Sequence, residues 1–236
     1  MPFTIIHEWR LVEPIRTKRG YTCAMKMRTV ACGVVCVFVT FGAVTSAQTH
    51  DDAPSEPLRH PVWNYGGQLS GGFTAVQVSS PNFLTANRNI SNFALSFRVG
   101  RVLTHEHGPG WLRGTFEWDF NVIPIEIFRV LGNHYAGGFE VFCPRWNFTH
   151  NFRRVVPFAG LTGGMLFSPR NFPPGDTYQT NFTVAIDAGA NLFIRHKQSW
   201  DVNARVYHLS NAFLGPLNPG IPVGVQFTLG YSWYGR

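Results

Sequence analysis

Apolar and polar residues alternate with a period of two over long stretches of this chain. The alternation is clearest in residues 111–123, 177–193 and 221–233. In the last stretch, one face carries Ile221, Val223, Val225, Phe227, Leu229, Tyr231 and Trp233, and the other carries Gln226, Thr228 and Ser232. Successive side chains of a β-strand point to opposite faces of its sheet, so each stretch predicts a strand with one apolar and one polar face.

Weaker alternation predicts further strands and brings their number to about eight. These segments are residues 63–78, 90–103, 133–148, 155–167 and 199–210. Eight antiparallel strands make the smallest closed transmembrane barrel, whose interior is filled by side chains and leaves no water pore. The predicted inward set carries both signs of charge: Arg98, Arg113, Arg205, Glu117, Asp119, Glu140 and Asp187. We therefore predict a paired polar interior, which argues against a channel.

A soluble sandwich or lipocalin-like barrel shows the same alternation with the polarity reversed. Two features favour the membrane. The apolar faces run for six or seven successive positions, and aromatic residues near the predicted strand ends resemble the girdles of outer-membrane barrels. These aromatic residues are Trp63, Tyr65, Trp111, Trp200, Tyr231, Trp233 and Tyr234. The predicted fold is all-β, an eight-stranded antiparallel transmembrane β-barrel.

The composition agrees with this fold. Aromatic residues make up 15% of the chain and charged residues 14%, and there are 24 glycines, proportions that suit a glycine- and aromatic-rich β-protein. The net charge of +7 lies partly in the N-terminal region, and the other basic residues are dispersed. Dispersed charge argues against nucleic acid as a partner and is compatible with attraction to an anionic membrane surface.

The N-terminal region has the pattern of an export signal. Positive charge at Met27-Arg28 precedes an apolar run that is too short to span a membrane comfortably, and small residues follow up to Ala47. We predict residues 1–47 to be an N-terminal extension and signal peptide that is cleaved near Ala47, with translation starting at Met1, Met25 or Met27. Residues 48–61 are then a polar spacer, and residues 62–236 form the barrel.

Cysteine and histidine give no sign of a metal or cofactor. Cys23, Cys32 and Cys36 lie within the predicted leader, so only Cys143 remains after cleavage and no intrachain disulfide can form. Cys143 is on an apolar face without a basic neighbour, which predicts an inert, lipid-facing thiol. His105 and His107 are the best spaced histidines, and two ligands do not make a metal site.

The predicted strand over residues 199–210 carries the candidate chemistry. Its alternate positions place Ser210, His208, Val206, Ala204 and Val202 on the apolar face. In a transmembrane barrel that face contacts lipid. Neutral imidazole is well matched to take a serine proton near pH 7. A histidine two residues from a serine therefore suggests a base and a nucleophile that are presented to a lipid.

The residues around this pair carry a family resemblance. The motif His208-Leu209-Ser210-Asn211-Ala212, followed by Asn218-Pro219-Gly220-Ile221 and a last amphipathic strand, resembles the lipid A 3-O-deacylase (PagL) family. The resemblance implies an exported esterase of the bacterial outer membrane that removes the ester-linked acyl chain at the 3-position of lipid A in lipopolysaccharide. It also implies Ser210 as nucleophile and His208 as general base, with no cofactor. The sequence does not indicate an oligomeric state.

Three further residues decide how closely the site follows that family. Asn211 is a candidate oxyanion donor, through its amide or a neighbouring backbone N–H. The family's histidine-orienting Glu is replaced here by Pro222, and Phe213 stands where the family commonly has Gly. Asn218 is a candidate to orient His208, as an Asn does in Cys-His-Asn sites. The alternative hypothesis is a non-enzymatic barrel of the same fold.

Overall fold

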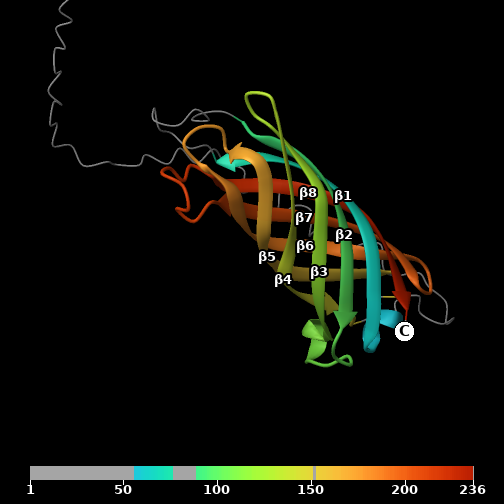
Figure 1. Ribbon diagram of the computed structural model, residues 1–236. Helices are drawn as coiled ribbons and strands as arrows, with labels where there is room; N and C mark the ends of the chain where they lie inside the picture. Colours follow the sequence, from blue (N-terminus) through green and yellow to red (C-terminus); the bar gives the residue numbers. More distant parts are fainter. Residues whose placement is uncertain (1–55, 77–88, 151–152, 236) are drawn as a thin grey trace, which may run out of the picture.

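A computed structural model describes residues 56–76, 89–150 and 153–235 of the chain. The predicted signal peptide, its cleavage site near Ala47 and most of the spacer lie outside these residues. Eight strands pair antiparallel in chain order and close into one barrel, because β1 also pairs with β8 (Figure 1). The strands are β1 (Val62–Val76), β2 (Ser91–Val102), β3 (Gly114–Arg129), β4 (Asn133–Phe148), β5 (Val155–Phe172), β6 (Tyr178–Arg195), β7 (Gln198–Ser210) and β8 (Ile221–Gly235).

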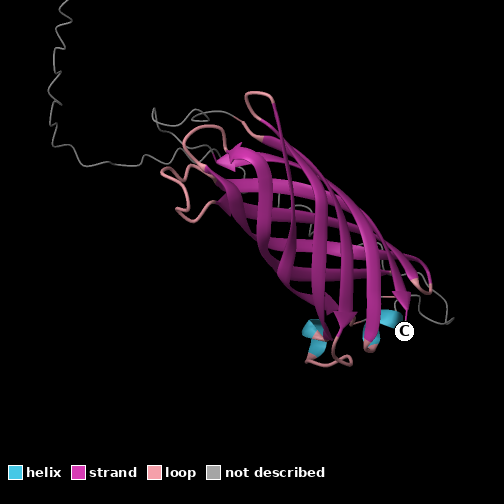
Figure 2. Cartoon of the chain, viewed as in Figure 1, coloured by secondary structure: helices cyan, strands magenta, loops and turns pink. Residues whose placement is uncertain are grey.

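The predicted strands are confirmed, with some different ends. Strand β3 begins at Gly114, because the preceding Gly110–Leu112 forms the 3-10 turn η3. It then continues to Arg129, well beyond the predicted end at residue 123. The only other helical element in the described residues is the 3-10 turn η2 (Glu56–Arg59) (Figure 2). No helix in this part of the chain combines the length and hydropathy that a membrane crossing requires.

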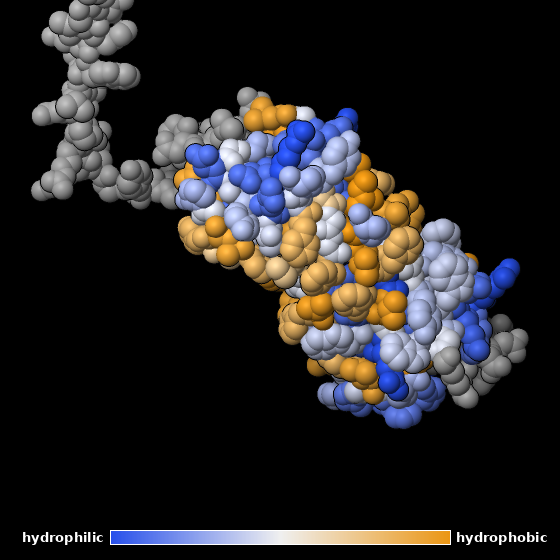
Figure 3. Space-filling view, viewed as in Figure 1, coloured by the Kyte–Doolittle hydropathy of each residue, from blue (hydrophilic) through white to orange (hydrophobic). Residues whose placement is uncertain are grey.

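The wall of the barrel is apolar outside and polar inside. The exposed side chains include many large apolar ones, such as Phe97 (53%), Val184 (61%) and Ile186 (64%), whereas many polar and charged side chains are buried. In Figure 3, apolar residues gather over the middle of the wall and hydrophilic residues at both ends. This polarity is that of a transmembrane barrel and excludes the lipocalin-like alternative, in which the apolar faces would point inward.

The two ends of the barrel differ in what they carry. The first and last strands pair from Trp63 with Gly235 onward, so the start of β1 and the C-terminal end of β8 lie together (Figure 1). The loop between β7 and β8, residues 211–220, lies at the opposite end. We call this segment the site loop. One end of the barrel therefore holds the start of β1 and the end of β8, and the other end holds the site loop.

Aromatic side chains gather on the outer face of β7, β8 and β1, near the start of β1 and the end of β8. Trp63, Tyr65, Trp200, Tyr231 and Trp233 form ring contacts there, with centroids 4.6 to 6.4 Å apart. The expectation for Tyr234 was wrong, because this residue follows Trp233 directly and therefore points to the other face. Its ring is buried in the interior, where Tyr234 Oη lies 3.3 Å from Ser199 Oγ.

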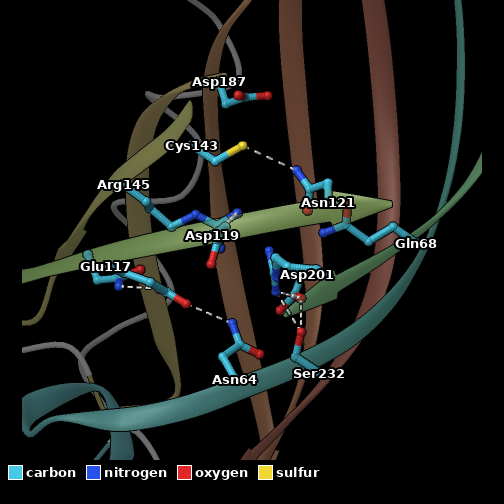
Figure 4. Close-up of polar contacts among 12 residues, drawn as sticks. Asn64, Gln68, Glu117, Asp119, Asn121, Cys143, Arg145, Asp187, Asp201 and Ser232 are labelled. Carbon is cyan, nitrogen blue, oxygen red and sulfur yellow. Dashed lines mark hydrogen bonds and ion pairs between the residues drawn. The ribbon is translucent and has the colours of Figure 1, made fainter. Parts of the chain in front are cut away.

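Ion pairs and hydrogen bonds fill the interior (Figure 4). The fully buried Arg98 donates through Nη2 to Asp201 Oδ2 and Ser232 Oγ, both at 2.6 Å. Arg205 contacts Glu140 and Asp187, each at 2.7 Å. Two further groups complete the network: Arg145 pairs with Asp119 at 3.1 Å, and Glu117 accepts hydrogen bonds from Asn64 and Asn147. The predicted ion pairing is confirmed for Arg98, Arg205, Asp119, Glu140 and Asp187, and Glu117 is inside the barrel with amide donors as its partners.

The interior has little free space. A cavity lined by Glu126, Arg205 and Tyr207 has a volume of about 30 Å³. A single water needs roughly 10 to 15 Å³ on this measure, so the cavity has room for only a few waters. It is far below the 300 to 1,000 Å³ typical of small-molecule sites.

Two further predicted orientations were wrong. Arg113 was expected inside, but it precedes β3, its side chain is half exposed, and it pairs with Glu106 at 3.2 Å. Cys143 was expected to face lipid, but it is 2% exposed and accepts a contact from Asn121 inside the barrel. The cause is a β-bulge after Glu140, where Val141 and Phe142 are both exposed. The extra residue reverses the inward and outward alternation for the rest of β4.

Removing Arg98 should be costly, because Asp201 would be left as an uncompensated buried charge. We expect Arg98→Met to lower the free energy of unfolding by about 3 to 5 kcal/mol, measured by urea unfolding in detergent micelles. The matched control is Arg113→Met, which removes an ion pair from a half-exposed position and should cost less than about 1 kcal/mol. Equal losses in the two variants would contradict the structural role given to the buried pair.

Candidate functional site

His208 and Ser210 lie near the end of β7 on the outer surface of the barrel. Their partners on β6 are Val184 and Phe182, in regular antiparallel register. His208 is exposed and Ser210 is half-buried. The outward, apolar setting that the alternation predicts for these two residues is therefore the one found. Both belong to the end of the barrel that carries the site loop.

On its other side, His208 faces an irregularity in β8. The register moves from Tyr207 paired with Gly224 to Leu209 paired with Ile221, so two residues of β8, Pro222 and Val223, lie opposite His208. This is the arrangement of a β-bulge, a feature enriched beside active sites. Proline has no N–H to give to a ladder and is tolerated in a sheet at such a bulge.

The bulge brings the Pro222 carbonyl to the His208 ring. His208 Nδ1 lies 3.1 Å from Pro222 O. A carbonyl oxygen can only accept a hydrogen bond, so Nδ1 must carry the proton. In the neutral imidazole this leaves Nε2 unprotonated and able to act as a base. The contact that we expected from Asn218 is thus made by a backbone group of β8.

Asn211 and Asn218 contact each other across the site loop. Asn218 Oδ1 accepts the backbone N–H of Asn211 at 2.9 Å, and Asn211 Nδ2 donates to Leu217 O at 2.8 Å. Asn211 Oδ1 in turn accepts the N–H of Phe213 at 3.0 Å. Asn211 is only 1% exposed. Both side chains therefore hold the loop that directly follows Ser210.

The loop ends at a position that requires glycine. Gly220 has φ +49°, and a Cβ on it would lie far too close to the Leu209 carbonyl oxygen of β7. Only glycine adopts this left-handed conformation without steric cost and admits the neighbouring backbone so closely. The motif glycine thus returns the chain into β8 directly beside the strand end that carries Ser210.

Ser210 Oγ accepts the backbone N–H of Ala212 at 3.3 Å. Among the described residues, no hydrogen bond joins the His208 ring to Ser210 Oγ. Residues i and i+2 of a strand are roughly 6.5 to 7 Å apart at the backbone. Inclined side chains can span this gap, and catalytic hydrogen bonds are often long until substrate binds.

Ala212 and Phe213 both have left-handed backbones, with φ of 50° and 61°. For a residue with a Cβ this conformation costs roughly 1 to 2 kcal/mol. The glycine common in the family at position 213 is thus the residue that this backbone favours. Here Phe213 is 80% exposed instead, so a large apolar ring projects from the loop beside Ser210.

No acidic side chain hydrogen-bonds to His208 within the described residues. Asp187 of the neighbouring β6 points inward to Arg205, as predicted. The described residues also contain no group of three or more His, Cys, Asp or Glu that is suited to hold a metal ion. Two exposed histidines, His60 and His105, lie near each other, with 3.3 Å between their Nδ1 atoms.

Sequence reasoning missed the carbonyl of Pro222, and it did not single out the N–H of Ala212 among the backbone N–H groups near Asn211. Both groups belong to the backbone, which every residue possesses, so residue identity does not reveal them. The only available signal was a proline inside an otherwise regular strand pattern, which suggests a bulge.

Comparison with known protein families assigns the sequence to one of them. The sequence model described as "Lipid A 3-O-deacylase (PagL)" matches residues 107–232, more than half of the chain. No curated protein matches the chain by sequence.

Solved structures that this chain matches include the outer membrane enzyme PagL, with 16% identity, 74% of this chain and 99% of that chain covered, and a TM-score of 0.40. Neisserial surface protein A has 11% identity, 73% and 96% coverage, and a TM-score of 0.41. The outer membrane protein AlkL has 13% identity, 81% and 95% coverage, and a TM-score of 0.43. Because these TM-scores are low, the assignment depends on the sequence match. This chain belongs to the lipid A 3-O-deacylase (PagL) family.

Proposed function

We propose that this protein is an outer-membrane esterase that removes the 3-position acyl chain of lipid A. The observation that supports the proposal is that His208, whose Nδ1 contacts a carbonyl oxygen, and Ser210 lie two residues apart on the same lipid-facing side of β7. The base and the nucleophile both face the phase in which a lipid acyl chain lies. A soluble substrate would instead require a water-facing pocket.

The location of the pair along the barrel suits an ester near the membrane surface. His208 and Ser210 lie at the end of β7, next to the site loop, rather than in the middle of the apolar wall. An exported barrel enters the outer membrane from the periplasm, so we assign the end at which β1 begins and β8 ends to the periplasm. The site then faces the outer leaflet, where lipid A resides.

The chemistry follows from the two side chains. Ser210 Oγ attacks the ester carbonyl carbon while His208 Nε2 takes the hydroxyl proton. The tetrahedral intermediate collapses, the sugar alcohol leaves with the proton from His208, and an acyl-serine remains. Water, deprotonated by the same imidazole, then attacks the acyl-serine, and the fatty acid is released.

The developing oxyanion needs a hydrogen-bond donor close to Ser210 Oγ. We assign this role to the backbone N–H of Ala212. This group donates to Ser210 Oγ in the free protein, so it lies close to the position of the attacked carbonyl. The first candidate, Asn211, is buried and donates to Leu217 and Asn218 instead. We therefore assign Asn211 and Asn218 to holding the loop that presents Ala212.

The first expected outcome concerns location. Because the apolar wall needs lipid around it, the protein should fractionate with the outer membrane and migrate differently on electrophoresis before and after heating. Mass spectrometry of the isolated protein should find an N-terminus near Gln48. Recovery of folded protein as a monomer in buffer without detergent would rule out the lipid-facing site.

The second expected outcome concerns the nucleophile. Purified protein in detergent should release fatty acid from lipid A, and Ser210→Ala should lower the rate by on the order of 10³-fold or more. His208→Asn should have a comparable effect, because the two groups act as one unit. Fatty acid release, followed by mass spectrometry, measures both.

Ser91→Ala is the matched control, since Ser91 begins β2, is half-buried and lies away from β7. It should retain the full rate. Unchanged release in Ser210→Ala would exclude this serine as the nucleophile. If the wild type released nothing from lipid A or from other ester lipids, the non-enzymatic barrel would be the better description.

A further inference from the structure

We propose that the backbone carbonyl of Pro222 is the group that orients His208, in the place where the family uses a glutamate side chain. The inference rests on the proposed esterase function for its consequence, but the hydrogen bond itself can be tested without turnover. Pro222 is then a positioning residue, which acts on the substrate only through the imidazole.

The bulge makes this contact available. In a regular antiparallel pair, a carbonyl points to the neighbouring strand or away from it within the sheet. At the bulge, two β8 residues oppose the single residue His208, so one of them is left out of the regular ladder. Pro222 has no N–H, and its carbonyl lies 3.1 Å from His208 Nδ1. The His208 Nδ1–H thus finds an acceptor, and the Pro222 carbonyl, which lies outside the regular ladder, finds a donor.

A carbonyl can replace the orienting carboxylate and still leave His208 able to act as a base. In serine proteases, replacing the orienting Asp by Asn lowers kcat by roughly 10⁴ because the imidazole adopts the wrong tautomer. A carbonyl accepts from Nδ1–H just as a carboxylate does, so it preserves the correct tautomer. It lacks the negative charge that stabilises the imidazolium formed during attack. We therefore expect a correctly oriented but weaker base.

The membrane environment favours this replacement. Val184 and Phe227, both on the outer wall of the neighbouring strands, are 61% and 55% exposed. A charged carboxylate on such a lipid-facing wall carries a solvation cost that depends on its depth. A peptide carbonyl carries no net charge, and here its hydrogen bond to His208 satisfies it.

The direct test is the tautomer of His208. ¹⁵N-histidine-labelled Ser210→Ala protein in detergent micelles can be studied by NMR above the pH at which the ring is protonated, with the signal assigned by its loss in a Ser210→Ala, His208→Asn double variant. We expect a proton on Nδ1 and none on Nε2. A proton on Nε2, or rapid exchange between the two tautomers, would overturn the proposal even if the enzyme were active.

Asn218→Ala separates the two candidate acceptors. Because Asn218 Oδ1 accepts from Asn211 and not from His208, the Nδ1–H tautomer should persist in this variant. Loss of the tautomer in Asn218→Ala would assign the orienting role to Asn218. Pro222→Ala, which keeps a carbonyl at this position, should also preserve the tautomer, and its loss there would contradict the proposal.

Pro222→Glu tests the missing charge. A carboxylate at this position should raise kcat by about tenfold or more, because it adds electrostatic stabilisation to an imidazole that is already oriented. It should also move the acidic limb of the pH profile of kcat/KM to higher pH, since it favours the protonated ring. A lower kcat with an unmoved limb would mean that the acceptor position lies elsewhere. An inactive wild type with the expected tautomer would contradict the esterase function and leave the orienting contact standing.

Discussion

The structure depends on pairing buried charges inside a closed barrel. Eight strands leave no water-filled lumen, so every inward charge must find a partner among the side chains of other strands. Arg98 of β2 reaches Asp201 of β7, and Arg205 of β7 reaches Glu140 of β4. These contacts cross the barrel, so they join strands that share no backbone hydrogen bonds. Closure and interior pairing therefore support each other.

A filled interior leaves the outer surface as the place for chemistry. The alternation along β7 sends Arg205 inward and both His208 and Ser210 outward, because each of the two lies an odd number of positions after Arg205. A strand end then gives these two residues an apolar wall on one side and a polar loop on the other. Under the proposed function, this is the boundary at which an ester-linked acyl chain of a membrane lipid would meet its sugar.

Small local irregularities give the site its polar groups. The bulge opposite His208 supplies a carbonyl, and the left-handed turn after Asn211 directs the Ala212 N–H to Ser210 Oγ. Asn218 supports that turn by accepting the backbone N–H of Asn211, and Gly220 lets the chain return closely beside the end of β7. The motif residues around His208 and Ser210 thus act mainly through the backbone that they hold in place.

The sequence by itself determined the fold and the face of the site. A period of two fixes which side chains share a face, and apolar faces of six or seven residues indicate contact with lipid. The eight strands and the outward His208 and Ser210 therefore followed from the pattern.

Tertiary structure decided the features that depend on strand pairing. The bulge after Glu140 turned Cys143 inward, and the η3 turn kept Arg113 out of the barrel. The bulge in β8 set the Pro222 carbonyl against His208. Sequence periodicity could not show these, because one extra residue reverses every later position, and the direction of a carbonyl depends on the partner strand.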